Sequence, residues 1–145
     1  MAARLPRRAL LAAPLLISRP ARAAEPLTFD DLYAGWRVTG LVFSDRAKLL
    51  DGKPATMAGF MAPPLKAEAD FFVLTREPMS MCPFCSSDSE WPPDIVVAYL
   101  RRQSQPTAPN AVIEVTGQLE LGSWTDPASG FVSQVRLRGA SVRLA

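Results

Sequence analysis

Residues 111–144 constrain the fold more than any other part of the chain. From Ala111 to Trp124 apolar residues alternate with polar ones, and the alternation returns from Phe131 to Leu144 after a loop that contains Pro127 and Gly130. A period of two is typical of a β-strand with one buried face, and a proline placed early and a glycine placed late are typical of a reverse turn. After Gly139 the alternation shifts by one residue, which predicts a β-bulge.

Shorter segments upstream also have the composition of strands. They are rich in apolar, β-branched and aromatic residues and comprise residues 36–44, 55–62, 69–76 and 94–100. The last of these also fits a helix capped by Asp94, but its β-branched residues favour a strand. Asp51-Gly52 predicts a tight turn. Leu27 to Gly35 predicts one short helix, with Thr28 and Asp31 in a capping box.

These segments predict an all-β domain. The expected architecture is a small five- or six-stranded OB-like barrel with one short N-terminal helix, because closure removes the exposed edges that short strands otherwise leave. The OB-like form is favoured because the long loop around Cys82 and Cys85 falls between the third and fourth predicted strands, where we expect its middle connection. A β-sandwich is the alternative.

The N-terminal residues predict an export signal. Arg7-Arg8 precede an apolar run from Ala9 to Ser18, and small residues follow at 21–24. We therefore expect a signal peptide over residues 1–23, a single domain over 24–145, and a periplasmic or secreted protein. The paired arginines also suggest a twin-arginine signal. The apolar run is much shorter than the roughly 20 residues that span a bilayer, so no permanent membrane span is expected after cleavage.

Charge and the absence of histidine exclude several functions. All 14 acidic residues follow Ala24, whereas five of the 16 basic residues precede it, so the predicted mature protein is net acidic. Its basic residues are scattered, which argues against nucleic-acid binding. The chain has no histidine, so Ser-His-Asp or Cys-His catalysis and imidazole metal ligands are impossible. Asp88, Glu90 and Asp94 are most simply solvated loop residues.

Cys82-Pro83-Phe84-Cys85 and the nearby Met79 and Met81 are the strongest candidates for a site. One interpretation is a structural disulfide, which an exported protein can retain. A second is a metal site: two thiolates, with Met79 and Met81 as thioether ligands, suit Cu(I). Zinc requires two more ligands, such as Asp88 and Glu90 or a second chain's cysteines.

The third interpretation is thiol–disulfide exchange. The four residues resemble the redox motif of glutaredoxins, in which one thiolate attacks and the other resolves. In that fold the motif opens a helix, whereas Pro92-Pro93 leave room here for barely two turns. This alternative makes the protein a thiol–disulfide oxidoreductase.

The tryptophans and two other methionines have ordinary structural interpretations. Trp36, Trp91 and Trp124 are suited to stacking on a ligand, but packing is the more common use of tryptophan. Met57 and Met61 share a strand face and are expected to fill the core.

Several of these motifs occur together in a known pattern. Gly59-Phe60-Met61-Ala62-Pro63-Pro64-Leu65, the apolar strand 71–74, the cysteine loop and Pro92-Pro93-Asp94-Ile95-Val96-Val97 follow in that order. Over residues 36–145 the chain resembles a family of small exported bacterial proteins known only as a domain of unknown function. Some relatives carry Cys-x-His in the loop. The resemblance implies an envelope protein whose partners are transporter components.

Together these observations lead to one main hypothesis. The chain is expected to be a non-enzymatic periplasmic accessory or binding module that serves an envelope transporter. Its Cys82–Cys85 loop is expected to bind a soft metal, copper or zinc.

Overall fold

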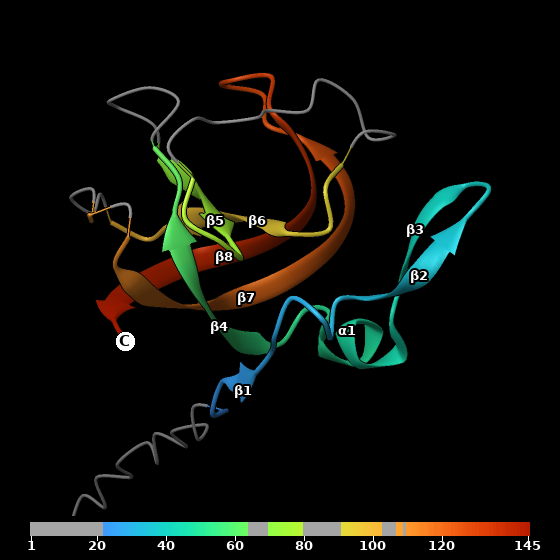
Figure 1. Cartoon of the computed structure of the whole chain (residues 1–145), viewed down its shortest axis with the longest axis horizontal. Coiled ribbons are helices and arrows are strands. Elements are labelled where there is room, and N and C mark those ends of the chain that lie inside the picture. The colour runs from blue at the N-terminus through green and yellow to red at the C-terminus, as the bar shows by residue number, and fades with distance from the viewer. Residues whose placement is uncertain (1–21, 64–69, 80–90, 103–106, 109) are drawn as a thin grey trace, which may run out of the picture.

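The computed structural model describes residues 22–63, 70–79, 91–102, 107–108 and 110–145. Its elements are shown in Figure 1 and comprise β1 (Glu25–Pro26), β2 (Tyr33–Arg37), β3 (Gly40–Phe43), α1 (Asp45–Leu50), β4 (Pro54–Met61), β5 (Phe71–Thr75), β6 (Ile95–Leu100), β7 (Val112–Thr125) and β8 (Val132–Leu144). The prediction of a mostly β protein is confirmed, and five of the predicted strand segments coincide with β4 to β8 within about two residues.

Six strands form one mixed sheet in the order β1-β4-β5-β6-β8-β7. Successive strands from β4 to β6 are antiparallel, β6 runs parallel to β8, and β8 is antiparallel to β7. Strand β4 pairs with β7 as well as with β5, so the hydrogen-bonded pairs form a ring. Figure 1 shows the long strands β7 and β8 curving around the shorter ones.

A bulge and two crowded glycines accompany this curvature. Thr116 and Gln118 pair with Ser141 and Arg138, so β8 has one more residue than β7 across this interval. The extra residue falls at Gly139, whose φ is 57°, and the predicted bulge is confirmed. A Cβ on Gly59 would lie 2.5 Å from the carbonyl oxygen of Thr75, and one on Gly117 would lie 2.8 Å from that of Arg138. Side chains are excluded where the ring strands approach so closely.

The main core lies inside the ring. Ile113, Val115 and Leu119 of β7 are fully buried together with Val135 and Leu137 of β8, as the period-two pattern predicts. Met57 and Met61 are also buried in this cluster, which confirms that they fill the core. The strand β5 is buried on both faces, because a second apolar cluster packs outside it around Phe71, Val73, Ile95, Val97, Ala62 and Trp91.

Segment 36–44, predicted as one strand, instead contributes to a hairpin. Strands β2 and β3 form a separate two-stranded sheet that projects beside the ring (Figure 1). The chain reverses at residues 38–39, and Gly40 follows with a φ of 107°, a value that β-branched residues avoid. The hairpin lies outside the ring, so the cysteine loop joins the second and third ring strands. In the whole six-stranded sheet, which includes β1, the loop lies between the third and fourth strands, as predicted, although the first strand is β1 and not segment 36–44.

The helix predicted over residues 27–35 is also wrong. Asp31 Oδ2 accepts hydrogen bonds from the backbone N–H and hydroxyl of Thr28, as in the expected capping box, but only a turn follows. Leu27 and Leu32 are buried in the ring core, and this packing holds the segment in a non-helical path. The helix is α1 instead, where the Ser44 side chain accepts a hydrogen bond of 3.0 Å from the N–H of Ala47.

The predicted signal peptide falls almost wholly outside the described residues. Among the helices of the described part, none is both long and apolar enough to cross a bilayer.

Candidate binding site at the base of the cysteine loop

Strands β5 and β6 bring the two ends of the cysteine loop together. Thr75 pairs with Ile95 at the last step of the antiparallel register. One residue further, the N–H of Arg76 donates a hydrogen bond of 3.0 Å to the carbonyl of Asp94. The chain then runs to Met79 on one side and returns at Trp91 on the other. A scaffold of buried strands therefore fixes the base from which the loop departs.

A buried threonine directs the chain as it leaves β5. The Thr75 side chain is 2% exposed, and its hydroxyl donates a hydrogen bond of 2.7 Å to the carbonyl of Glu77. The carbonyl of Phe60 on β4 lies 3.2 Å from the same oxygen. This hydrogen bond spans the bend at residues 76–77, where the chain leaves the strand.

Arg76 ties the loop base to the N-terminal turn. Its Nη1 lies 2.8 Å from Asp30 Oδ1, and its Nε lies 2.8 Å from Asp94 Oδ1. The guanidinium also lies over the ring of Phe29, 5.7 Å from the centroid. The hydrogen bond to Asp30 and the nearby carboxylates raise the pKa of Arg76, so this cation stays charged.

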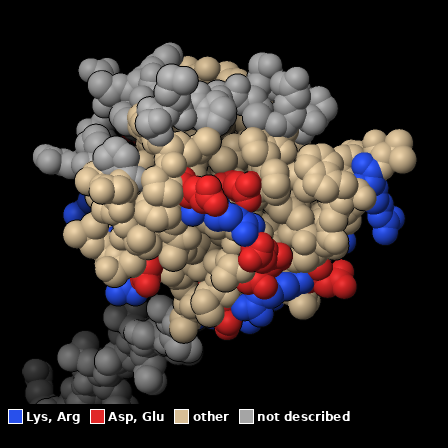
Figure 2. Space-filling model, in the orientation of Figure 1, with Lys and Arg blue, Asp and Glu red and all other residues tan. Residues whose placement is uncertain are grey.

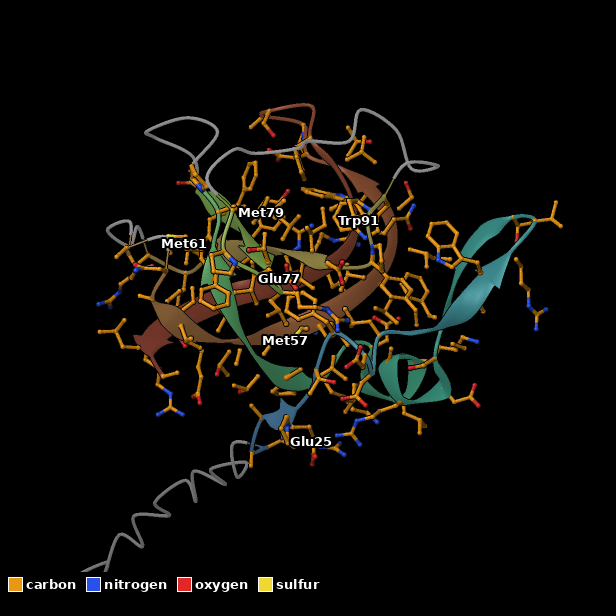
Figure 3. The ribbon with its side chains drawn as sticks, in the orientation of Figure 1. Glu25, Met57, Met61, Glu77, Met79 and Trp91 are labelled. Carbon is orange, nitrogen blue, oxygen red and sulfur yellow. The ribbon has the colours of Figure 1, made fainter. Side chains whose placement is uncertain are left out.

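A hollow of about 270 Å³ opens between the two ends of the loop. Among the described residues that line it, Met79 is the one that carries sulfur; the others are Thr75, Arg76, Glu77, Pro78, Pro92, Asp94 and Ile95. Met79 and Trp91 both appear toward the loop end of the ring in Figure 3. The described lining thus combines a soft thioether with the carboxylates of Glu77 and Asp94, and the second of these is paired with Arg76.

The other predicted ligands lie outside the described residues. These are Cys82, Cys85 and Met81, together with the alternative zinc ligands Asp88 and Glu90. Within the described part of the chain, no cluster of three or more Cys, Asp or Glu residues is arranged to hold a metal ion. The metal-site prediction therefore depends on the loop, and Met79 is the one predicted ligand that the structure places.

Trp91 joins the returning end of the loop to the projecting hairpin. Its side chain is 3% exposed and packs in the outer apolar cluster. Its Nε1 donates a hydrogen bond of 2.9 Å to the hydroxyl of Tyr33 on β2. Burial raises the pKa of Tyr33 to about 12, although the bond from Trp91 acts in the opposite direction. The predicted packing role of this tryptophan is confirmed.

A second polar cluster on the outer side of β7 and β8 is structural. The buried guanidinium of Arg136 bonds to Glu120 Oε2 at 3.1 Å and, through Nη1, to the carbonyl of Gly122 at 2.8 Å. Arg138 lies over Trp124, 4.0 Å from the ring centroid, and bonds to the same carboxylate oxygen of Glu120 at 2.9 Å. The two guanidinium groups share the carboxylate of Glu120, and the cluster joins the C-terminal part of β7 to β8.

A second hollow lies beside the hairpin and is larger than the one at the loop base. No residue spacing in the sequence predicted it. Its volume is about 640 Å³, and it is lined by Tyr33, Trp36, Arg37, Val38, Thr39, Gly40, Leu41, Phe43, Trp91 and Gln134. The signal in the sequence was the aromatic composition of residues 33–43 interrupted by Gly35 and Gly40. Trp36 is 65% exposed, so the prediction that tryptophans pack fails at this position.

The described residues define a small β-ring domain in which β5 and β6 hold the two ends of the cysteine loop together. Its structure is similar to the crystal structure of a DUF3299 family protein from Pseudomonas aeruginosa PAO1, with a TM-score of 0.55 and 15% sequence identity. The match covers 85% of this chain and 97% of the other. At this identity the likeness concerns the fold. No family model matches the sequence, and no curated protein matches it significantly.

Proposed function

We propose that the protein is an exported, non-enzymatic binding module that holds a soft metal ion at the Cys82–Cys85 loop. The observation that carries the proposal is the pairing of β5 with β6, which brings both loop ends to one hollow that Met79 lines. Two thiolates and one or two thioethers are the ligands that Cu(I) prefers. Zinc would draw two further ligands from loop carboxylates.

We also propose that the ring is an OB-like barrel. The support is its pairing: a three-stranded meander β4-β5-β6, a parallel pair β6–β8, and β7 placed between β8 and β4. OB-fold proteins bind their ligands at the barrel surface, partly through the loops between strands. The cysteine loop is such a connection, and the ring would supply rigidity rather than a catalytic group.

The sequence pattern and the structural likeness suggest membership of the DUF3299 family. On this basis we propose that the chain is released into the periplasm or secreted after cleavage near residue 23. Its partner would be a component of an envelope transporter. N-terminal sequencing of the protein recovered from a periplasmic extract tests the compartment and the cleavage position together.

The metal proposal is tested by anaerobic titration of the reduced protein with Cu(I) and, separately, with Zn²⁺, in competition with a chromogenic chelator. One equivalent of Cu(I) should bind per chain. The Cys82→Ser/Cys85→Ser variant should lose it, and Met79→Leu should weaken it. Met57→Leu is the matched control, because Met57 is fully buried in the core and leucine conserves its volume.

Other outcomes of the same experiment would decide against this function. Absence of stoichiometric metal, with a disulfide that survives mild reductant, would assign the cysteines to structure. A thiol pKa far below the usual value of about 8.5, together with turnover of a protein disulfide, would favour the thiol–disulfide oxidoreductase.

A further inference from the structure

The β2–β3 hairpin presents an aromatic face toward the ring. Tyr33 pairs with Phe43 and Trp36 pairs with Leu41, and a register shift falls between Tyr33 and Gly35. Without that irregularity residues 33 and 36 would point to opposite faces of a strand. With it, both stand with their partners on one face, and Tyr33 stacks on Phe43 with centroids 5.5 Å apart.

This face forms one wall of the hollow beside the hairpin, and Trp91 and Gln134 are on the opposite wall. Trp91 lies on the side of the ring toward the hairpin in Figure 3. The volume of about 640 Å³ is within the range of pockets that receive large side chains or small ligands. Exposure of an aromatic wall to water is energetically unfavourable, and an exposed apolar surface of this kind commonly marks an interaction site.

Arg37 is the charged residue of this hollow. It makes no ion pair with any described residue, and the other lining residues are apolar or neutral. Figure 2 shows basic but no acidic side chains over the outer part of the hairpin, at the right of the view. Arg37 follows Trp36 directly, so its side chain leaves the opposite face of β2, and the charge complementary to this part of the hairpin is a carboxylate.

The hairpin also has an unpaired edge. Among the described strands β2 pairs with β3 alone, and its residues from Ala34 to Arg37 are exposed, whereas β3 is half-buried along its length. An unpaired strand edge is a template for an added strand, and a two-stranded sheet is only marginally stable by itself.

We propose that β2 receives an extended segment of a partner protein, which adds a strand to the hairpin. The segment would place an aromatic or branched side chain in the hollow against Trp36 and a carboxylate beside Arg37. Main-chain hydrogen bonds supply affinity in this mode, and pockets for alternate side chains supply specificity. The site is separate from the cysteine loop and does not require the metal function.

A membrane is the rival occupant of the same surface. Val38 at the hairpin tip is fully exposed and Trp36 is 65% exposed, and such residues also insert into lipid interfaces. The peptide is favoured because the hollow, although it reaches Val38 and Thr39 at the tip, extends to Phe43 and Trp91 at the other end of the hairpin, where the stacked aromatic pair lies. A flat bilayer surface would contact the tip without filling the hollow.

The test uses two acetylated and amidated hexapeptides, VTFEVT and VTFQVT, titrated into the ¹⁵N-labelled whole chain and followed by NMR. The glutamate peptide should shift the amide resonances of residues 33–43 and Trp91 saturably at millimolar concentrations. The glutamine peptide should bind about fivefold more weakly, since an exposed ion pair contributes up to about 1 kcal/mol.

Four variants make the result specific. Arg37→Gln should remove the preference for glutamate. The control is Arg101→Gln, which should leave the preference intact. Arg101 is also exposed and makes no ion pair with a described residue. Trp36→Ala should weaken both peptides at least about tenfold, as for a central aromatic contact. Cys82→Ser/Cys85→Ser should bind like the wild type, which separates this proposal from the metal function.

The proposal is overturned if neither peptide binds, if the shifts map away from the hairpin, or if Arg37→Gln leaves the glutamate preference unchanged. It is also overturned if vesicles of phosphatidylglycerol and phosphatidylcholine bind the chain through Trp36 and Val38 while the peptides do not. Each of these results would mean that the hairpin does not bind a partner segment by strand addition.

Discussion

The indole Nε1 of Trp91 donates a hydrogen bond of 2.9 Å to the hydroxyl of Tyr33, across 58 positions of sequence. This contact links the first described residue after the cysteine loop to the base of the projecting hairpin. It therefore joins the base of the loop to the hairpin through the buried Trp91 and the partly buried Tyr33.

Replacing Tyr33 by phenylalanine should lower the free energy of unfolding by about 1–2 kcal/mol, because the buried indole N–H of Trp91 loses its acceptor. Urea denaturation at neutral pH measures the change. Tyr99→Phe is the matched control, since the buried hydroxyl of Tyr99 has no hydrogen-bond partner among the described residues and should be nearly neutral. Equal losses in the two variants would show that the Trp91–Tyr33 bond contributes little.

Both tyrosines of the chain should resist ionisation at pH 10–11. Burial raises the pKa of Tyr33 to about 12 and that of Tyr99 to about 12, whereas in the unfolded chain each has the ordinary value of 10.0. A raised pKa contributes stability that is complete below pH 10 and is lost as the pH rises toward 12. Absorbance near 295 nm, recorded with and without urea at pH 10.8, measures ionisation. The prediction fails if the native and unfolded absorbances coincide.

Arg136→Met should destabilise the fold by about 2–4 kcal/mol, because it leaves the buried carbonyl of Ser133 and the partly buried carbonyl of Gly122 without this donor. Arg143→Met is the control, since Arg143 pairs with Glu114 at the surface and its side chain is 74% exposed. Its effect should be below about 1 kcal/mol. Similar midpoints in thermal denaturation for both variants would contradict a stabilising role for the buried arginine.

Stability should fall in acid partly through Glu120. Burial acts to raise the pKa of this carboxyl, but hydrogen bonds from Arg138 and Arg136 outweigh it, so the pKa lies below its ordinary value of 4.5. A lowered pKa gives stability that is present above pH 4.5 and is lost as the pH falls through the native value. Glu120→Gln should reduce the dependence of the urea midpoint on pH between about 5 and 3. If the urea midpoint of Glu120→Gln depended on pH as steeply as that of the wild type, groups other than Glu120 would be responsible for the loss of stability in acid.

Gly59→Ala should destabilise the ring by about 1–3 kcal/mol, as expected for overpacking, because the added methyl would lie 2.5 Å from the backbone oxygen of Thr75. Ala58→Ser, at the neighbouring exposed position, is the control and should change stability by less than about 0.5 kcal/mol. The same crowding at Gly117 predicts a similar loss there. Wild-type stability in both alanine variants would mean that the ring can widen without cost.

Local patterns predicted the strands well. The alternation in 111–144 located β7 and β8, and the shift in phase at Gly139 located the bulge, because side-chain direction in a strand depends only on position. The hairpin was missed for a related reason: residues 36–44 have uniform strand composition, and only the positive φ of Gly40 reveals the turn. The six-residue helix α1 was too short to show a helical period.

The candidate sites were predicted less completely. Sequence spacing selected Cys82, Cys85, Met79 and Met81, and the structure places Met79 at the base of the loop. The other three lie outside the described residues. The hollow beside the hairpin had no sequence motif, because its walls come from residues 33–43, Trp91 and Gln134, which are brought together only by folding.

By itself the sequence determined which segments are extended, where β8 bulges, and which chemistry is impossible without histidine. These properties follow from side-chain type and from a period of two, and neither depends on distant residues. Only the tertiary structure decided that β4 pairs with both β5 and β7, that Arg136 is buried, and that Trp91 meets Tyr33. Such contacts depend on packing between segments far apart in the chain, so no local sequence pattern predicts them.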